Sequence, residues 1–236
     1  SNLQIKSPEV EALEEKLFAI REKIFYTNSR NAKLQLEKEL TIIRERLKLQ
    51  LEKEGFPNDK SEKITSWDPF DQNTHADWFD PEWMFGIKNG FDIVIANPPY
   101  IDCEGMLNFG LEGLRKYISA NYSLTKGNWD IYVAFFEQGF KLLNANGILT
   151  YITPDKWISK PFGDELRKNK VNNIYSILKA GREIFEGSKI DAIVSFFIKN
   201  NIEKLKIFDI KDNKIIFKRE VNKNVLKSPF AFDFLF

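Results

Sequence analysis

Four consecutive residues, Asn97, Pro98, Pro99 and Tyr100, combine groups that could do chemistry on a planar ring. Two prolines in a row fix φ at both positions and remove two N–H donors. The groups that remain are acceptors, namely the side-chain oxygen of Asn97 and the carbonyl of Pro98, beside the flat aromatic face of Tyr100. A rigid pair of acceptors next to a stacking ring suits an exocyclic amino group on such a ring.

An amino group of this kind is a poor nucleophile, because its lone pair is delocalised into the ring. Acceptors for both of its N–H hydrogens would concentrate electron density on nitrogen, which is electrostatic preorganisation rather than general-base catalysis. A base in duplex DNA must leave the stack to reach such a pocket, and an aromatic platform helps to hold it there. The alternative is a strand-terminating Pro-Pro turn whose tyrosine is only packed.

The elements that must position these residues are a strand and its sheet. Residues 91–96 are mostly apolar and directly precede Asn97, and ligands in open α/β sheets bind outside the carboxyl ends of strands. Strand and helix patterns alternate from there on, which predicts an α/β sheet that is largely parallel at least through its first strands. Strands are expected at 91–96, 148–153, 173–178 and 190–198, with candidates at 205–210 and 214–218, and helices at 107–120, 131–144 and 163–170.

The segment before the strand has a different pattern. Residues 8–54 read as two charged amphipathic helices with a turn at 26–31, which predicts an antiparallel hairpin that begins at Ser7-Pro8. The hairpin is a packing or spacer element, or alternatively a DNA-contacting or dimerising coiled coil. Residues 56–90 read as a tryptophan-rich loop, and between Ser66 and Gly86 they carry five acids and no base, which argues against contact with a phosphate backbone.

Composition excludes several classes of protein. Lys plus Arg number 35 against 34 for Asp plus Glu, so net charge indicates no partner. The single Cys103 and the single His75 cannot form a Cys/His zinc site or a disulfide, and we read both as structural or incidental. The 12 glycines include no GxG, which excludes a GxGxxG turn and a P-loop. We expect no membrane span and a reducing, cytoplasmic setting.

The order of motifs resembles a known family. Residues 93–100 resemble motif IV of the amino-group methyltransferases that use S-adenosylmethionine, and later segments resemble motifs V to VIII of gamma-class N6-adenine DNA methyltransferases. The helical pair, the tryptophan-rich loop and FDIVIANPPY together most resemble type IIG restriction–modification enzymes. The segments that carry the later motifs are 130–137, 142–149, 152–158 and 183–194.

The resemblance implies a role for each matching residue. Asn97 and the Pro98 carbonyl would accept from the adenine N6 amino group, and Tyr100 would stack on an adenine flipped out of double-stranded DNA, with Pro99 beside it. Phe185 would close the base pocket from the other side, or else is a core residue before a turn. Asp130 and Tyr132 would lie near the cofactor and the base, although Asp130 could equally cap the helix that follows it.

The resemblance also implies what is missing. In this family a glycine-rich motif and an acidic ribose-binding residue precede motif IV, and neither is found here. Since the chain begins at Ser1 rather than Met, we expect a fragment covering motifs IV to VIII, with weak or no cofactor binding by itself. The edge of strand 91–96 would then be open, or covered by the N-terminal helices or by non-native self-association.

The expected fold is therefore the C-terminal half of a Rossmann-like S-adenosylmethionine-dependent methyltransferase sheet, preceded by a helical hairpin. Its segments are the hairpin over 1–55, the loop over 56–90, a partial methyltransferase domain over 91–200 and a basic, β-rich tail over 201–236. That tail is solvated surface, or alternatively a nucleic-acid contact. Two other functions stay open: a methyltransferase acting on a protein glutamine, because NPPYI occurs there too, and a non-enzymatic assembly module.

Overall fold

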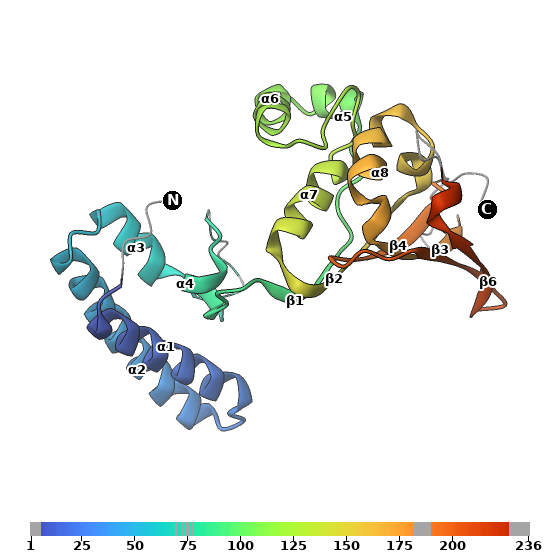
Figure 1. Cartoon of the computed structure of the whole chain (residues 1–236). Helices are drawn as coiled ribbons and strands as arrows, with labels where there is room; N and C mark the ends of the chain where they lie inside the picture. Colours follow the sequence, from blue (N-terminus) through green and yellow to red (C-terminus); the bar gives the residue numbers. More distant parts are fainter. Residues whose placement is uncertain are drawn as a thin grey trace. The chain divides into compact units, whose positions relative to one another are not determined.

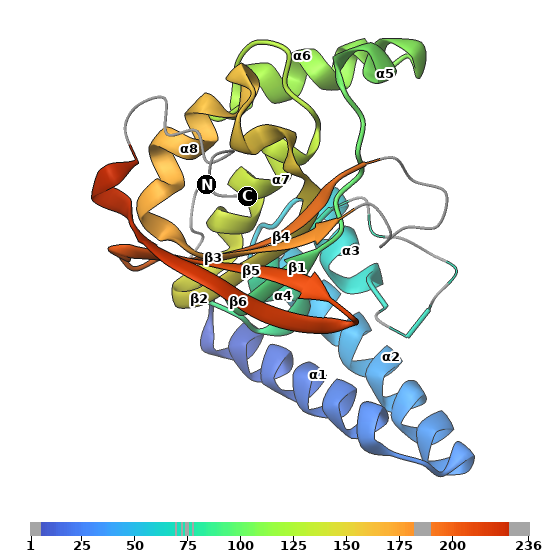
Figure 2. The same cartoon turned by 90° about the vertical axis from the view of Figure 1, so that its right-hand side faces the viewer.

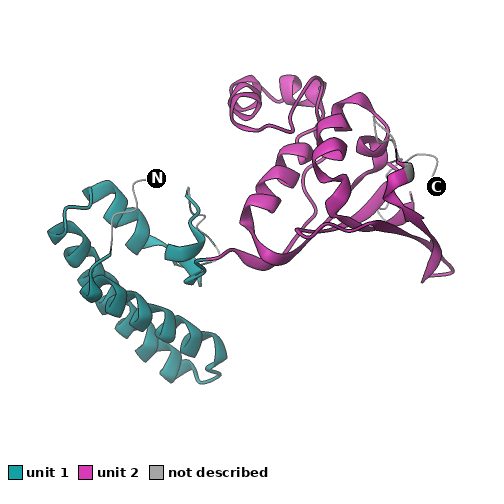
Figure 3. Cartoon of the chain, viewed as in Figure 1, with its two compact units in different colours: residues 1–88 teal, residues 89–236 magenta. Residues whose placement is uncertain are grey.

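The computed structural model describes residues 6–226, apart from positions 69, 72, 74, 75, 77 and 182–189. The chain forms two compact units, Ser1–Lys88 and Asn89–Phe236 (Figure 3). The first unit includes both the helical hairpin and the tryptophan-rich segment. Each unit has its own hydrophobic core, so each is described by itself.

The first unit is built on a helical hairpin of α1 (Pro8–Tyr26) and α2 (Arg30–Lys53), as the sequence predicts (Figure 1). Both helices begin at a serine whose side chain accepts from a backbone N–H three residues later, Ser7 from Val10 and Ser29 from Ala32. Such N-caps satisfy one of the donors that a helix start leaves open. Apolar side chains at helical spacing meet between the two helices and are buried there, namely Leu17, Ile20, Ile24, Leu40, Ile43, Leu47 and Leu51.

The segment predicted as a loop over 56–90 contains two helices, α3 (Asn58–Ser66) and α4 (Pro81–Phe85). The second has strong local signals: Asp80 accepts from two backbone N–H groups at its start, and Gly86 ends it in the left-handed region at φ 71°. At 5 residues it is too short for apolar periodicity to show. Ile64 of α3 is buried in the core of this unit, and Trp83 of α4 packs against that core.

The second unit is an α/β fold with one six-stranded mixed sheet in the order β1-β2-β4-β3-β5-β6 (Figure 2). Its helices α5 (Cys103–Asn108) and α6 (Glu112–Asn121) follow the first strand, α7 (Tyr132–Leu142) precedes the second, and α8 (Asp164–Lys170) precedes the third. The strands are β1 (Phe91–Ala96), β2 (Leu143–Pro154), β3 (Ile174–Gly181), β4 (Ala192–Ile198), β5 (Lys204–Lys211) and β6 (Lys214–Asn222).

The largely parallel sheet that the sequence predicts is only partly present. The pairs β1–β2 and β3–β5 are parallel, whereas β2–β4, β3–β4 and β5–β6 are antiparallel. After β2 the chain forms β3, which does not pair with β2. β4 then occupies the position between β2 and β3 and is antiparallel to both. Strand direction depends on how the chain returns and not on the residues of the strand, so the apolar runs could not reveal it.

β1 is an edge strand, because among the described residues it pairs only with β2. Ile93 and Ile95 on this strand are 61% and 76% exposed. As the sequence predicts, no strand in the described part of the chain pairs with the outer side of β1.

The core of the second unit lies between the sheet and α7. Phe136 of α7 is fully buried, and its ring contacts those of Tyr151, Trp157 and Phe197 at centroid distances of 5.2, 5.6 and 5.4 Å. α7 and α8 lie over the same face of the sheet (Figures 1 and 2). This packing places the start of α7 next to the carboxyl end of β1, where the predicted site begins.

Candidate functional site

The four residues Asn97 to Tyr100, called here the NPPY loop, leave the carboxyl end of β1. Asn97 and Pro99 are exposed, Pro98 is buried and Tyr100 is half-buried. The buried Pro98 anchors the loop against the unit, while the exposed Asn97 presents its amide at the edge of the sheet. The structure thus places a rigid, acceptor-rich loop at the position that the sequence predicts.

Tyr100 is held in place by contacts to two other elements. Its hydroxyl donates to the carbonyl of Ile152 in β2 at 3.2 Å. Its ring makes a T-shaped contact with that of Tyr132, at a centroid distance of 6.5 Å and an interplanar angle of 86°. Burial raises the pKa of the Tyr100 phenol, so the hydroxyl stays protonated and remains a donor to that carbonyl.

A backbone hydrogen bond links the NPPY loop to the start of α7. The N–H of Ile131 donates to the carbonyl of Ile101 at 2.9 Å. This bond joins segments 30 positions apart and brings Asp130 and Tyr132 beside Tyr100. Three of the predicted site residues, Tyr100, Asp130 and Tyr132, therefore lie in neighbouring segments. The family resemblance implied this proximity, but the sequence could not show which contacts produce it.

Asp130 is 6% exposed and does not cap α7, whose N-cap position is Ile131 without a side-chain hydrogen bond. The capping alternative is therefore wrong. Burial raises the pKa of Asp130, the nearby Lys156 lowers it and Asp102 raises it further, with a net upward shift. A carboxylate in this setting loses hydration that the neighbouring lysine only partly replaces.

Tyr132 is fully buried, and its hydroxyl lies beside the carboxyl group of Asp130. Burial raises the pKa of this phenol, and the neighbouring Asp130 raises it further. Its ring lies between those of Tyr100 and Phe162, at centroid distances of 6.5 and 6.3 Å. Tyr132 thus supports Tyr100 from behind and presents no open surface to a bound cofactor.

Other predicted residues lie elsewhere. Phe185 and His75 fall outside the described residues. Cys103 is half-buried at the first position of α5 and is reduced. No helix in the described segments has both the length and the apolar character needed to cross a membrane.

A lysine-lined cleft of about 650 Å³ adjoins these residues, and sequence reasoning missed it. The "lysine cleft" is lined by Lys126, Gly127, Asn128, Lys156, Lys160, Pro161, Phe162, Asp164, Glu165 and Lys168. Its wall residue Phe162 is the one that contacts Tyr132. The spacing of Lys156 and Lys160 by four positions was a local signal, but the near-zero net charge of the chain concealed the cluster.

The sequence of the chain is similar to those of restriction–modification methylases. A family model described as "Eco57I restriction-modification methylase" matches residues 12–196, from α1 to within β4. The type II restriction enzyme and methyltransferase RM.Eco57I of Escherichia coli is 28% identical over 174 residues, covering 72% of this chain and 16% of that protein. The type II methyltransferase M.PaeR7I of Pseudomonas aeruginosa is 35% identical over 81 residues, covering 34% of this chain and 13% of that protein.

Among solved structures, the type IIG restriction endonuclease BpuSI superposes on 59% of this chain and 20% of its own. The TM-score is 0.44 at 15% identity, so the relationship rests on the sequence matches. The chain spans only a small part of each of these relatives.

Proposed function

Because the chain belongs to the Eco57I restriction-modification methylase family, we propose that it supplies the base-holding part of a DNA methyltransferase that acts on adenine N6. The single observation that carries the proposal is the NPPY loop, whose exposed Asn97 and buried Pro98 leave the carboxyl end of β1 beside the anchored Tyr100. The parent reaction belongs to a restriction–modification system of the type IIG kind.

The proposed chemistry prepares a weak nucleophile. The side-chain oxygen of Asn97 accepts from one N–H of the adenine amino group and the carbonyl of Pro98 from the other. Both acceptors would draw the lone pair out of conjugation with the ring, so the nitrogen could attack the methyl carbon of a sulfonium donor. The new N–C bond would form as the methyl–sulfur bond breaks, the sulfur would leave as a neutral thioether, and the surplus amino proton would pass to solvent. Because the two acceptors are already in position, no free energy of reorganisation is added to the barrier of the reaction.

Tyr100 and Pro99 would hold the flipped base. Base–aromatic stacking contributes about 1–3 kcal/mol per base, which offsets part of the cost of leaving the duplex stack. The hydrogen bond from Tyr100 to Ile152 and the buried Tyr132 behind its ring support this role, because they hold the platform in one orientation. A pocket-closing role for Phe185 stays a prediction.

The methyl donor that the family resemblance implies is S-adenosylmethionine. The two residues predicted to contact it do not fit that role, since Tyr132 is fully buried and Asp130 is 6% exposed. We therefore assign both to positioning the NPPY loop and not to binding the donor.

The test is the rate of methyl transfer to duplex DNA by the full natural protein. Asn97→Ala should lower the rate by about 10²–10³-fold, the cost of removing one preorganised hydrogen-bonding group, and should leave the fold intact because Asn97 is exposed. Tyr100→Phe, which keeps the ring, should retain most of the activity. Asn108→Ala removes another exposed asparagine of the same unit and should have no effect.

Two outcomes would contradict the proposal. An unchanged rate in Asn97→Ala would exclude both the adenine and the glutamine reactions. Methylation of a glutamine-containing peptide, but not of adenine in DNA, would favour the protein substrate.

A further inference from the structure

The acidic side chains of the lysine cleft form ion pairs, whereas three of its lysines do not. Asp164 pairs with Arg167, and Glu165 pairs with Lys168 at 3.5 Å, so both acids of the cleft are neutralised by their own helix. Lys126, Lys156 and Lys160 are exposed and make no ion pair within the described ranges, while Lys156 lies near enough to Asp130 and Asp155 to lower the pKa of each. The cleft therefore has a surplus of positive charge in a chain that is nearly neutral as a whole.

One wall of the cleft is held by a buried arginine. The Arg167 guanidinium is fully buried and donates to the carbonyl of Lys160 at 2.9 Å and to that of Trp157. Gly163 completes this wall, because a Cβ there would lie 2.1 Å from the Trp157 carbonyl oxygen. The turn that carries Lys156 and Lys160 is thus fixed to α8.

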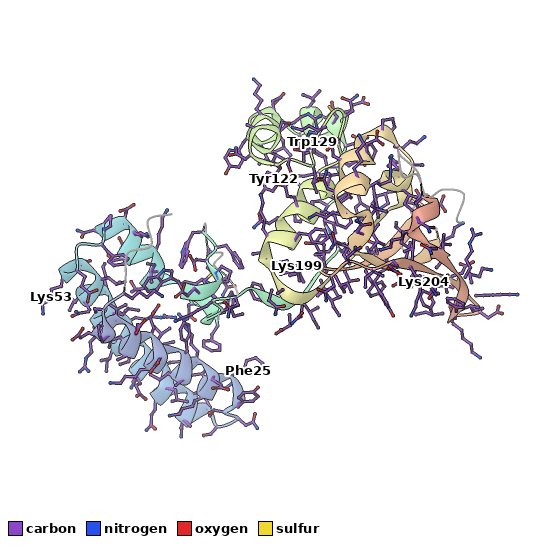
Figure 4. All side chains as sticks on the ribbon, in the orientation of Figure 1. Phe25, Lys53, Tyr122, Trp129, Lys199 and Lys204 are labelled. Carbon is purple, nitrogen blue, oxygen red and sulfur yellow. The ribbon has the colours of Figure 1, made fainter. Side chains whose placement is uncertain are left out.

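The opposite wall is held by a second arginine. Arg115 of α6 donates to the carbonyls of Gly127 and Trp129 at 3.1 and 3.3 Å, and its guanidinium lies 4.4 Å from the centre of the Trp129 ring. Trp129 is 1% exposed and also donates to Ser119 at 3.3 Å. Figure 4 shows Tyr122 and Trp129 in the segment between α6 and α7. Lys126 therefore projects from a clamped loop.

A chain of aromatic rings connects this cleft to the NPPY loop. Phe162 lines the cleft and meets Tyr132 at 6.3 Å, and Tyr132 meets Tyr100 at 6.5 Å. The separation between the lysines and the base platform is thus set by buried packing, which is what a contact that positions a substrate requires.

We propose that the lysine cleft binds backbone phosphates of the DNA strand that carries the target base, a proposal that rests on the function given above. Lysine ammonium groups are compact point charges on flexible stems, and they suit phosphates whose exact positions vary with sequence. Lysines on both walls would contact the strand from two sides. Phosphate contacts of this kind fix register and orientation and leave sequence to be read elsewhere.

The experiment measures DNA affinity of the full natural protein as a function of salt. The triple variant K126Q/K156Q/K160Q should lower the slope of log K against log salt by about 2 to 3, since each phosphate contact contributes about 0.9. The concentration of DNA at half-maximal rate should rise, while the rate at saturating DNA should change little. The Lys→Arg triple variant keeps the charges and should keep the slope.

A matched control removes the same charge elsewhere on the chain. Lys60, Lys88 and Lys116 are exposed and lie outside both the cleft and the basic tail, so K60Q/K88Q/K116Q should leave the slope within the error of the wild type. An unchanged slope in the cleft variant, or an equal loss in the control, would overturn the proposal. Displacement of cleft-bound DNA by millimolar adenosine monophosphate would point to a free nucleotide and would overturn it as well.

The two proposals fail separately. Asn97→Ala should lose methyl transfer and keep the salt slope, because Asn97 carries no charge. If wild-type protein does not methylate adenine but the cleft variant still loses slope, the proposed reaction is wrong and the phosphate contact stands.

Discussion

The two units of this chain differ in how some of their cationic side chains are paired. In the helical unit Lys6 bonds to Glu14 at 3.0 Å and to Glu82 at 2.9 Å, and Arg44 pairs with Asp68 at 3.3 Å. In the α/β unit, three lysines of the cleft and the amide of Asn97 face solvent. The contrast concerns the cleft: the cations named for the helical unit are paired within that unit, whereas these three cleft lysines make no ion pair in the described part of the chain.

The cores differ in a related way. The helical hairpin buries side chains from two segments that follow one another in the chain, whereas the core around Phe136 joins β2, the turn after it and β4. Packing between neighbouring segments is thus enough to form the hairpin, whereas packing between distant segments positions the NPPY loop. The predictions below test this division, from the largest expected effect to the smallest.

The largest effect is expected from truncating each core. Phe136→Ala should destabilise the α/β unit by about 3–5 kcal/mol, and Leu47→Ala should destabilise the helical unit by about 2–5 kcal/mol. Hydrogen exchange read by mass spectrometry should rise in residues 89–226 for the first variant and in 6–88 for the second. Faster exchange in both units from one substitution would show that the units are one cooperative body and would break the comparison.

A smaller, pH-dependent effect is expected from Asp130→Asn. Since burial raises the pKa of Asp130 above its ordinary 3.8, the folded unit binds more protons than the unfolded chain between that value and the raised one. Stability is therefore lost as pH rises through this window, and the full penalty remains at neutral pH. Asparagine carries no such penalty.

Denaturant unfolding of the α/β unit can measure this difference. The Asp130→Asn protein should be more stable than its parent at pH 7, and the gap should close as pH falls towards 3.8. A variant that is less stable than its parent at pH 7 would mean that the carboxylate makes a favourable charged contact. Its role as a buried positioning group beside Tyr132 would then need revision.

The smallest effect is expected from a surface ion pair of the helical unit. Lys48 and Glu62 lie 3.8 Å apart with side chains that are 39% and 69% exposed. Lys48→Ala should change stability by no more than about 0.5 kcal/mol, because exposed pairs gain little over hydration. A chemical denaturation series with and without 1 M salt checks this, and a loss above 1 kcal/mol would show that charge pairing stabilises this unit more than its packing suggests.

Much of the fold could be predicted because its signals are local. Ser7-Pro8 and Ser29 mark helix starts through groups within three residues, and the apolar run of β1 followed by two prolines marks a strand end. The acceptor chemistry of Asn97 and Pro98 follows from residue types alone. These features need no knowledge of distant contacts, which is why the sequence was sufficient for them.

Only the tertiary structure decided the rest. The antiparallel return of β4 between β2 and β3, the burial of Tyr132 behind Tyr100, and the meeting of Lys126 with Lys156 and Lys160 all join residues far apart in the chain. The arginine clamps that hold both walls of the cleft act through backbone carbonyls, which every residue carries. A sequence states which side chains exist and which local turns they favour. Which groups end up without an ion-pair partner is set by long-range packing, and the proposed phosphate contact is argued from those groups.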